Sequence, residues 1–353
     1  MQIKSILQLK IDIRKLSKSE LEQYFIDQNL PKYRAIQVWE WIWKKQKSSF
    51  SEMRNIPKSL IEILQNDFEI NNIAVDKKQV SIDGTIKNRI KLHDGHLVES
   101  VLIPVVEKSR FTACVSSQVG CSLTCKFCAT GKMKLRRNLD ASEIFDQVAL
   151  LNQQCLDKYD HKLTNIVYMG MGEPLLNYKN VLKSIHYITS EVGLGMSPKR
   201  ITVSTVGIAK MIKKLADEDV KFNIALSLHA ADDAKRSQIM PINDQNNLDT
   251  LMDALEYFHL KTKNRISYEY ISFKGLNDTP KDALNLVKLC KKFPVKVNII
   301  EYNAIDGVSF ERSTNINIDQ LAQILQHHNI TATVRKSRGM DIDAACGQLA
   351  NKD

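Results

Sequence analysis

Three closely spaced cysteines are the residues whose type and spacing point most directly to chemistry. They lie in the run Cys121-Ser-Leu-Thr-Cys125-Lys-Phe-Cys128, which is followed by Ala129-Thr-Gly131. Three thiolates at this spacing can bind three irons of a 4Fe–4S cluster, and no fourth cysteine follows at a spacing that completes the site. The remaining iron could therefore chelate a small molecule and pass an electron to it. A zinc knuckle is the alternative, but zinc needs a fourth ligand, usually from a second CxxC or HxxxH pair.

A glycine-rich stretch, Tyr168-Met-Gly-Met-Gly172-Glu173-Pro174, is a second candidate binding element. Glycine lets the backbone approach a ligand closely, and a carboxylate such as that of Glu173 can accept hydrogen bonds from an ammonium group. Alone the motif is weak, because a simple turn has the same composition.

Two further cysteines could take part in thiol chemistry. Cys346 follows the basic run Arg335-Lys-Ser-Arg338 in a glycine-flanked loop, and nearby cations favour the thiolate that a nucleophile needs. The negative charges of Asp341 and Asp343 disfavour that thiolate, so the sequence does not fix the pKa of Cys346. Cys114 lies near the end of a predicted strand, where a buried and inert thiol is the default interpretation.

The composition indicates a large globular protein with a polyanionic partner. The chain has 353 residues, with 50 basic against 40 acidic side chains and a net charge of +10, which favours nucleic acid without requiring it. Seven cysteines in a chain of this length do not form a disulfide scaffold, and Cys155 and Cys290 are interpreted as core. No segment approaches the ~20 apolar residues of a membrane span, and the start lacks a signal peptide. We therefore predict a cytoplasmic protein with no membrane partner.

Residues 1–76 are predicted to form a small helical domain. Ser17-Lys-Ser-Glu20 is a capping box, and helices are expected to begin at Pro31 and Pro57. The basic and aromatic surface of this domain is a candidate for contacting RNA, although a solvated charged face explains the same residues.

Residues 77–103 are predicted to form a β-meander that connects the helices to the next domain. Asp83-Gly84 and Asp94-Gly95 are strong hairpin-turn pairs. Glu99 lies in the last of these strands, where such a carboxylate is usually solvated.

Residues 104–353 alternate strands with amphipathic helices, the helices including 141–152, 181–190, 248–262 and 280–291. This order predicts an α/β fold with a parallel sheet, closed partly into a (β/α)6-type barrel whose chemistry lies at the carboxyl ends of its strands. The cysteine run follows the first strand. The predicted strands are 111–115, 165–169, 201–205, 222–228, 266–272, 295–300 and 331–335.

Polar residues follow several of these strands. They are Ser204 after the third, Ser227-Leu228-His229 after the fourth and Asn303 after the sixth. Each alone is an ordinary polar loop residue, and His229 alone is more often structural. Together they would converge on one barrel mouth, as a ribose and an amino-acid carboxylate require.

These motifs together resemble one family, the radical S-adenosylmethionine (radical SAM) enzymes that methylate C2 of adenine in 23S ribosomal RNA and in tRNA. Relatives that methylate C8 share the cysteines but have alanine after the Gly-Glu pair, so Pro174 favours the C2 enzymes. The motifs that carry the resemblance are Pro31-Lys-Tyr-Arg-Ala, Ser116-Ser-Gln-Val-Gly-Cys121, Gly170-Met-Gly-Glu-Pro-Leu-Leu176, Met240-Pro-Ile-Asn243 and Asp341-Ile-Asp-Ala-Ala-Cys-Gly-Gln-Leu349.

The resemblance implies a reaction in two stages that uses two SAM molecules. Cys346 first takes a methyl group by displacement. A 4Fe–4S cluster on Cys121, Cys125 and Cys128 then reduces a second SAM to a 5′-deoxyadenosyl radical, which abstracts hydrogen from that methyl, and the resulting carbon radical adds to adenine C2. Glu99 is the implied proton acceptor. Cys114 is implied to release the product through a transient Cys114–Cys346 disulfide, which cellular thiols would reduce.

The resemblance also implies SAM-binding residues and partners. The partners are 23S rRNA, tRNA and a low-potential electron donor of the flavodoxin type, which the sequence does not identify. Whether tRNA is a substrate as well as rRNA stays open, as do C8 methylation and a non-catalytic zinc-bearing RNA-binding protein. Candidate phosphate contacts are Arg136, Arg137, Lys199 and Arg200. The implied SAM-binding residues are Gly172, Glu173, Ser204, Ser227, Leu228, His229 and Asn303.

Overall fold

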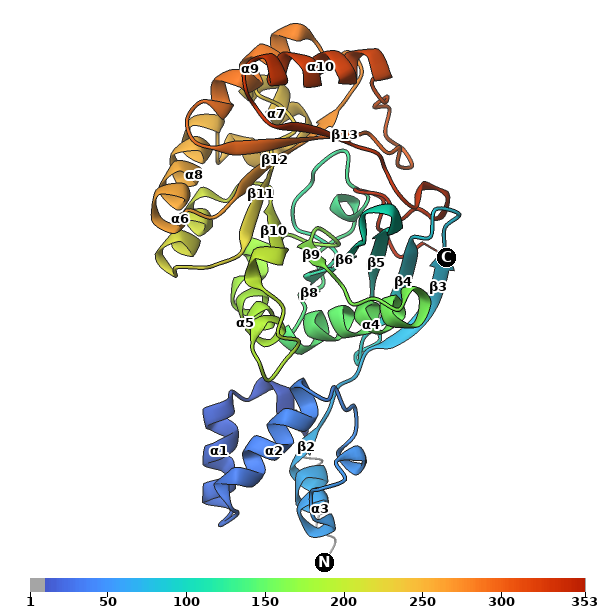
Figure 1. Cartoon of the computed structure of the whole chain (residues 1–353), viewed down its shortest axis with the longest axis vertical. Helices are drawn as coiled ribbons and strands as arrows, with labels where there is room; N and C mark the ends of the chain where they lie inside the picture. The colour runs from blue at the N-terminus through green and yellow to red at the C-terminus, as the bar shows by residue number, and fades with distance from the viewer. Residues whose placement is uncertain (1–9, 353) are drawn as a thin grey trace, which may run out of the picture.

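In the computed structural model, which describes residues 10–352, seven parallel strands form the curved centre of the molecule (Figure 1). They are the seven strands that the sequence predicts, and their ends differ from the prediction by at most one residue. Neighbouring strands pair in the order of the chain, so their carboxyl ends meet at one side of the sheet. The strands are β6 (Arg110–Cys114), β9 (Asn165–Tyr168), β10 (Ile201–Thr205), β11 (Asn223–Ser227), β12 (Ile266–Ser272), β13 (Val295–Glu301) and β14 (Ala332–Arg335).

The barrel stays open between β6 and β14, because the free edge of β6 pairs antiparallel with β5 (Leu97–Val105). The sheet continues through β4 (Ile86–Lys91) to β3 (Ala74–Val80), with tight turns at the two predicted Asp-Gly pairs. The meander is therefore part of the same sheet as the barrel, and β3 begins three residues before the predicted connector 77–103. The predicted α/β fold with a partial barrel is confirmed.

Helices cover the outer face of this sheet (Figure 1). The four predicted helices are present, and α4 runs on to Tyr159, beyond its predicted end at residue 152. Three further helices, α6, α7 and α10, were not predicted from the sequence, and the first two are too short to show a long apolar period. The described part of the chain has no helix whose length and apolar character would suit a membrane span. The helices are α4 (Ala141–Tyr159), α5 (Tyr178–Thr189), α6 (Ala209–Asp217), α7 (Asp233–Ile239), α8 (Leu248–Thr262), α9 (Pro280–Cys290) and α10 (Asn315–His327).

The amino-terminal part contains α1 (Lys18–Asp27), α2 (Lys32–Trp43) and α3 (Lys58–Asp67). The predicted capping box before α1 is present, and the short strands β1 (Ile11–Asp12) and β2 (Phe68–Glu69) pair in parallel. The first nine residues of the predicted domain 1–76 lie outside the described residues.

Aromatic packing joins the amino-terminal helices to the barrel. Trp43 of α2 stacks on Tyr187 of α5 with ring centroids 3.8 Å apart, and its edge meets Phe145 of α4 at 5.2 Å. Arg14 binds the carboxylate of Asp146 on α4 at 2.8 Å. These contacts fix the helices beside α4 and α5, at the end of the molecule drawn in blue in Figure 1.

Candidate active site

A pocket of ≈ 350 Å³ and a larger one of ≈ 670 Å³ lie inside the barrel, and the larger one reaches the loops at the carboxyl ends of the strands. The larger volume is typical of a small-molecule site. Of the predicted site residues, Glu99, Leu228 and Asn303 do not line it. Those that do are Cys114, Cys121, Cys125, Cys128, Gly172, Glu173, Ser204, Ser227, His229 and Cys346.

The loop with the three cysteines begins after β6 and is closed at its base by the antiparallel pair β7 (Gln118–Val119) and β8 (Arg137–Asn138). Two hydrogen bonds attach it to the C-terminal segment, from Ala129 N to Gly347 O at 2.7 Å and from Thr130 Oγ1 to Leu349 O at 2.6 Å. A third, from Lys126 N to Ile239 O at 2.9 Å, attaches it to the end of α7. The loop is thus fixed from both sides.

The three cysteine thiols have surroundings that suit the binding of one positively charged iron cluster. Burial raises the pKa of Cys121 to about 11, and it raises the pKa of Cys125 and Cys128 as well. Their mutual repulsion as thiolates adds to the shift in Cys125. A bound metal would stabilise three buried thiolates here. Within residues 10–352 no group of three or more Cys, His, Asp or Glu side chains is arranged to hold a single metal ion, whereas a 4Fe–4S cluster distributes its thiolates over separate irons.

The glycine-rich stretch after β9 presents a buried carboxylate to the pocket. Gly172 has φ +93°, and a Cβ there would lie 2.5 Å from Cβ of Gln118, so only glycine fits. Glu173 accepts hydrogen bonds from Val206 N at 2.9 Å and Leu175 N at 3.1 Å. Burial nevertheless raises the pKa of Glu173 to about 7, so a cationic ligand group beside it would be stabilising.

The ends of β10 and β11 add hydroxyl groups and an imidazole. The Oγ atoms of Ser204 and Ser227 lie 3.4 Å apart, on adjacent strands. His229 accepts a hydrogen bond at Nδ1 from Ile271 N, and its ring meets the edge of Phe127 in the cysteine loop at 4.7 Å. Burial lowers the pKa of His229 to about 3, with the Arg236 charge adding to the shift. The imidazole is therefore neutral, with its proton on Nε2.

Leu228 and Asn303 do not line the pocket, but each forms a hydrogen bond with a residue next to it. Leu228 is fully buried, and its carbonyl accepts a hydrogen bond from Arg236 Nε at 3.0 Å. Asn303 Nδ2 donates to the carbonyl of Cys346 at 3.2 Å, which ties the end of β13 to the C-terminal loop. Its Oδ1 is buried without a hydrogen-bond partner within the described chain.

Cys346 and Cys114 lie in the same pocket. The side chain of Cys346 is exposed to that pocket, yet its enclosed surroundings raise the pKa of the thiol, and Arg335 opposes this shift. The neighbouring carboxylate is Glu269, because Asp341 binds Ser81 and Asp343 binds Lys352. The predicted competition from those two aspartates is therefore wrong.

Cys114, at the end of β6, is buried, and both burial and the nearby charge of Cys346 raise its pKa. Every cysteine in the structure is a free thiol, so the Cys114–Cys346 disulfide expected for one stage of the reaction is not formed. Cys155 and Cys290 are buried in α4 and α9, as predicted.

Glu99 is buried rather than solvated, and the structure does not bring it into the pocket. Its Oε2 accepts hydrogen bonds from the backbone amides of Ala350 at 2.8 Å and Asn351 at 3.1 Å. Its Oε1 lies 3.4 Å from Lys87 Nζ, which is also buried. Glu99 thus anchors the segment that follows Cys346 to the meander.

Two groups at the site were missed from the sequence. Arg236 of α7 is fully buried and donates to the carbonyls of Leu228 and Val206 and to Asn243 Oδ1. The Met240-Pro-Ile-Asn243 motif was the available signal, and it supplies this asparagine. Glu269, inside β12, accepts hydrogen bonds from Asn298 at 2.7 Å and Arg335 at 3.3 Å. It had no sequence signal, because it occupies a strand interior rather than a strand end.

Two family models match the chain. Residues 115–308 match the radical SAM superfamily. Residues 11–70 match the N-terminal domain of ribosomal RNA large subunit methyltransferases. The first range spans the cysteine loop and most of the barrel, and the second spans the amino-terminal helices.

Individual relatives are similar over nearly the whole chain. A protein of Christiangramia forsetii named probable dual-specificity RNA methyltransferase RlmN is 54% identical over 97% of each chain. The dual-specificity RNA methyltransferase RlmN of Nautilia profundicola is 40% identical over 92% of this chain and 94% of its own. The crystal structure of a radical SAM methyltransferase from Sphaerobacter thermophilus superposes with a TM-score of 0.91 at 36% identity, covering 97% of this chain and all of that one.

Proposed function

Because this chain belongs to the RlmN family of radical SAM RNA methyltransferases, we propose that it methylates C2 of adenine in 23S rRNA and in tRNA. The shared name of its relatives, dual-specificity RNA methyltransferase, supports action on two kinds of RNA. The observation that carries the proposal is that one pocket contains the three-cysteine set and a separate pair of thiols, Cys114 and Cys346. Adenine C2 is electron-poor and cannot attack SAM directly, so a carrier thiol and radical chemistry are both needed.

We assign Cys121, Cys125 and Cys128 to the 4Fe–4S cluster, which when bound supplies the electron that cleaves SAM to a 5′-deoxyadenosyl radical. Glu173 would accept hydrogen bonds from the ammonium group of SAM. Ser204, Ser227 and the neutral His229 would bind its polar groups. Gly172, which has no side chain, would let the ligand approach the backbone closely. Leu228 and Asn303 would support this site through Arg236 and the Cys346 carbonyl.

We assign the methyl-carrying role to Cys346. Its thiolate would attack the sulfonium methyl carbon of SAM, forming an S–C bond while the bond from that carbon to the sulfonium sulfur breaks. Arg335 favours this thiolate electrostatically. Cys114, deprotonated to its thiolate, would later attack Sγ of Cys346 and form the disulfide, while the electron pair of the broken S–C bond stays with the RNA-bound carbon, which takes up a proton and becomes the methyl group. Reduction of that disulfide by cytoplasmic thiols would restore both cysteines.

Proton removal from C2 is assigned to Glu99 on the family resemblance alone. In the structure its carboxylate is held by Lys87 and by the amides of Ala350 and Asn351. This role therefore requires the C-terminal segment to move and release the carboxylate.

We further propose the division into an RNA-contacting helical domain (1–76), a connector (77–103) and a catalytic barrel with its C-terminal loop (104–353). The match of residues 11–70 to a ribosomal RNA methyltransferase domain supports the first unit. A flavodoxin-type protein is the proposed electron donor.

The test is a product assay with anaerobically reconstituted protein on 23S rRNA fragments and on tRNA. We expect 2-methyladenosine in both products by mass spectrometry of nucleoside digests. A methyl group at C8 would identify the other branch of the superfamily instead. Colourless protein rich in zinc would favour the RNA-binding alternative.

The affinity for SAM is expected to fall as the pH drops below about 7, the value to which burial raises the pKa of Glu173. The protonated carboxyl forms at lower pH and cannot pair with the ammonium group, so the affinity loss approaches about tenfold per pH unit. Equilibrium dialysis at pH 8, 7 and 6 measures this dependence. Glu173→Gln should bind SAM weakly and with little change over this range. A variant that retained the wild-type profile would show that Glu173 does not bind the ammonium group.

A further inference from the structure

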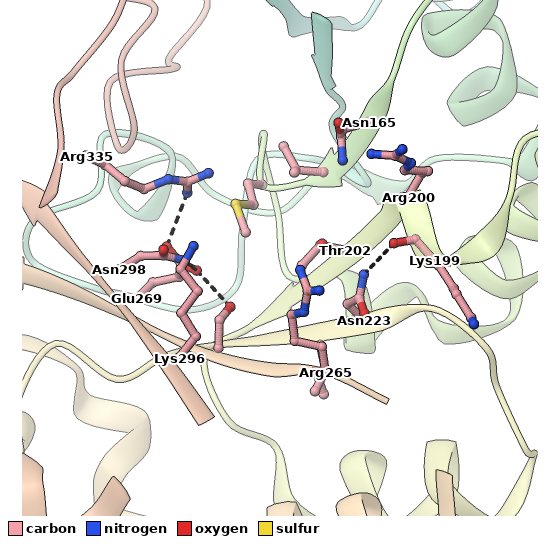
Figure 2. Close-up of a pocket in the computed structure, with 14 residues that line it drawn as sticks. Asn165, Lys199, Arg200, Thr202, Asn223, Arg265, Glu269, Lys296, Asn298 and Arg335 are labelled. Carbon is pink, nitrogen blue, oxygen red and sulfur yellow. Dashed lines mark hydrogen bonds and ion pairs between the residues drawn. The ribbon is translucent and has the colours of Figure 1, made fainter. Parts of the chain in front are cut away.

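A strongly basic opening lies at the other end of the barrel, near the amino ends of its strands. Figure 2 shows this pocket of ≈ 350 Å³, with Arg200, Arg265, Lys296 and Arg335 drawn around it. Arg200 precedes β10, Arg265 precedes β12 and Lys296 is the second residue of β13, whereas Arg335 is the last residue of β14. The residues therefore come from separate strands of the barrel, so the fold itself gathers this positive charge.

This opening adjoins the active-site pocket. Thr202, Glu269 and Asn298 line both cavities, so the two cavities meet at these residues inside the barrel, and Cys346 lines the larger one. The carboxyl end is partly occupied by the cysteine loop and the C-terminal segment, which are hydrogen-bonded to one another. No residue of either segment lines the basic end, which therefore offers a second approach to the pocket.

The charge at this opening is largely uncompensated. Five cationic side chains line it against one carboxylate, Glu269. That carboxylate already accepts hydrogen bonds from Ser267, Asn298 and Arg335.

Within the described residues, no acidic side chain forms an ion pair with Lys199, Arg200 or Arg265, all of which are exposed. Burial lowers the pKa of Lys296, and repulsion from Arg335, Arg265 and Arg110 lowers it further, whereas the charge of Glu269 opposes this shift. A bound anion would relieve this repulsion.

The backbone around the opening is held in place before any ligand binds. Asn223 Nδ2 donates to the carbonyl of Lys199 at 2.8 Å (Figure 2). It also donates to the carbonyl of Ile201 at 3.2 Å. Arg137 was also predicted to contact phosphate. Its guanidinium instead forms ion pairs with Asp94 at 2.5 Å and Glu143 at 2.7 Å.

We propose that RNA enters the barrel from this amino-terminal end, with backbone phosphates beside the target adenine bound by Lys199, Arg200 and Arg265. The unstacked adenine passes Glu269 and Asn298 to reach Cys346. Cations at the rim bind phosphate without reading sequence, so one opening can accept both rRNA and tRNA loops. The inference rests on the proposed function, since it assigns the path by which that substrate enters.

The test compares a triple variant, Lys199→Ala, Arg200→Ala and Arg265→Ala, with wild type in binding a tRNA anticodon stem-loop at several salt concentrations. Each lost phosphate contact removes about 0.7 from the slope of log K against log salt for single strands. We expect a slope shallower by about 2 and binding weaker by on the order of 10- to 100-fold near 0.1 M salt. Iron content and thermal unfolding establish that the variant is folded.

A matched control carries the same change of charge on the outer helices, with Lys213→Ala, Lys281→Ala and Lys288→Ala. These lysines are exposed on α6 and α9, and the control should bind RNA like wild type. Wild-type affinity and salt slope in the triple variant would overturn the entry path, as would equal losses in both variants. Loss of binding only on replacing Lys32, Lys44 and Lys45 would place RNA on the amino-terminal helices and also overturn it. The proposed function fails separately, if wild type forms no 2-methyladenosine.

Discussion

Replacing Cys346 with alanine is expected to abolish methylation of RNA and to leave the protein itself without a methyl group. The variant lacks the sulfur that accepts the methyl group and later carries it to C2, so both stages fail. We expect turnover to fall by at least about 10³-fold, as when a covalent nucleophile is removed from an enzyme. Methyl transfer from labelled SAM to RNA, together with mass spectrometry of the C-terminal peptide, measures both losses.

Cys290→Ala is the matched control for this substitution. Cys290 lies on α9, buried and outside the pocket, so its loss should leave methyl transfer near wild type. Iron content should be the same in both variants, because neither residue belongs to the cysteine run. Residual RNA methylation in Cys346→Ala would show that the methyl group reaches C2 without a carrier thiol at this position.

Replacing Cys114 with alanine is expected to trap the enzyme on its RNA. Cys346 can still carry the methyl group and form the adduct, but the thiol that attacks its sulfur is absent. The Cys114 thiol lies near Cys346, and burial first, then the charge of Cys346, raise its pKa, so the thiol stays protonated unless it acts on the adjacent sulfur. Denaturing gels with end-labelled RNA should show a covalent protein–RNA band in place of released product.

The double variant Cys114→Ala and Cys346→Ala separates this adduct from adventitious crosslinking, because it should give no such band. Normal multiple turnover in Cys114→Ala would exclude a resolving role for this residue. A band that persisted in the double variant would show that the crosslink does not involve Cys346.

The barrel strands could be predicted almost to the residue because each is a short apolar run between turn residues, a local signal. The same local signals predicted the capping box at Ser17 and the turns at Gly84 and Gly95. The joining of the meander and the barrel into one sheet could not be predicted, since it depends on β5 pairing with β6. Periodicity describes single segments and carries no information about which edges meet.

The candidate site likewise contains residues that local sequence signals predict and residues that only tertiary contacts place. The cysteine run was found from its spacing and Glu173 from the glycine motif, and their places in loops after β6 and β9 predicted that they lie close together, because parallel strands bring their carboxyl ends to one side. The position of Glu99 was not, since its partners at residues 350 and 351 are some 250 residues away along the chain. The role of Arg236 also depends on tertiary contacts. Its partners include the carbonyls of Leu228 and Val206, and no spacing in the sequence identifies them.

The C-terminal segment connects regions that lie far apart in the sequence. Gly339 and Asp341 bind the turn between β3 and β4, Gly347 and Leu349 bind the cysteine loop, and residues 350 and 351 bind Glu99. The buried apolar side chains of residues 339–352 are Ala344, Ala345 and Leu349, a small apolar anchor, so we expect this segment to open by local unfolding before the barrel strands do. Mild heating or low denaturant should therefore detach Cys346 while the barrel remains folded, and activity would be lost reversibly before the iron is released.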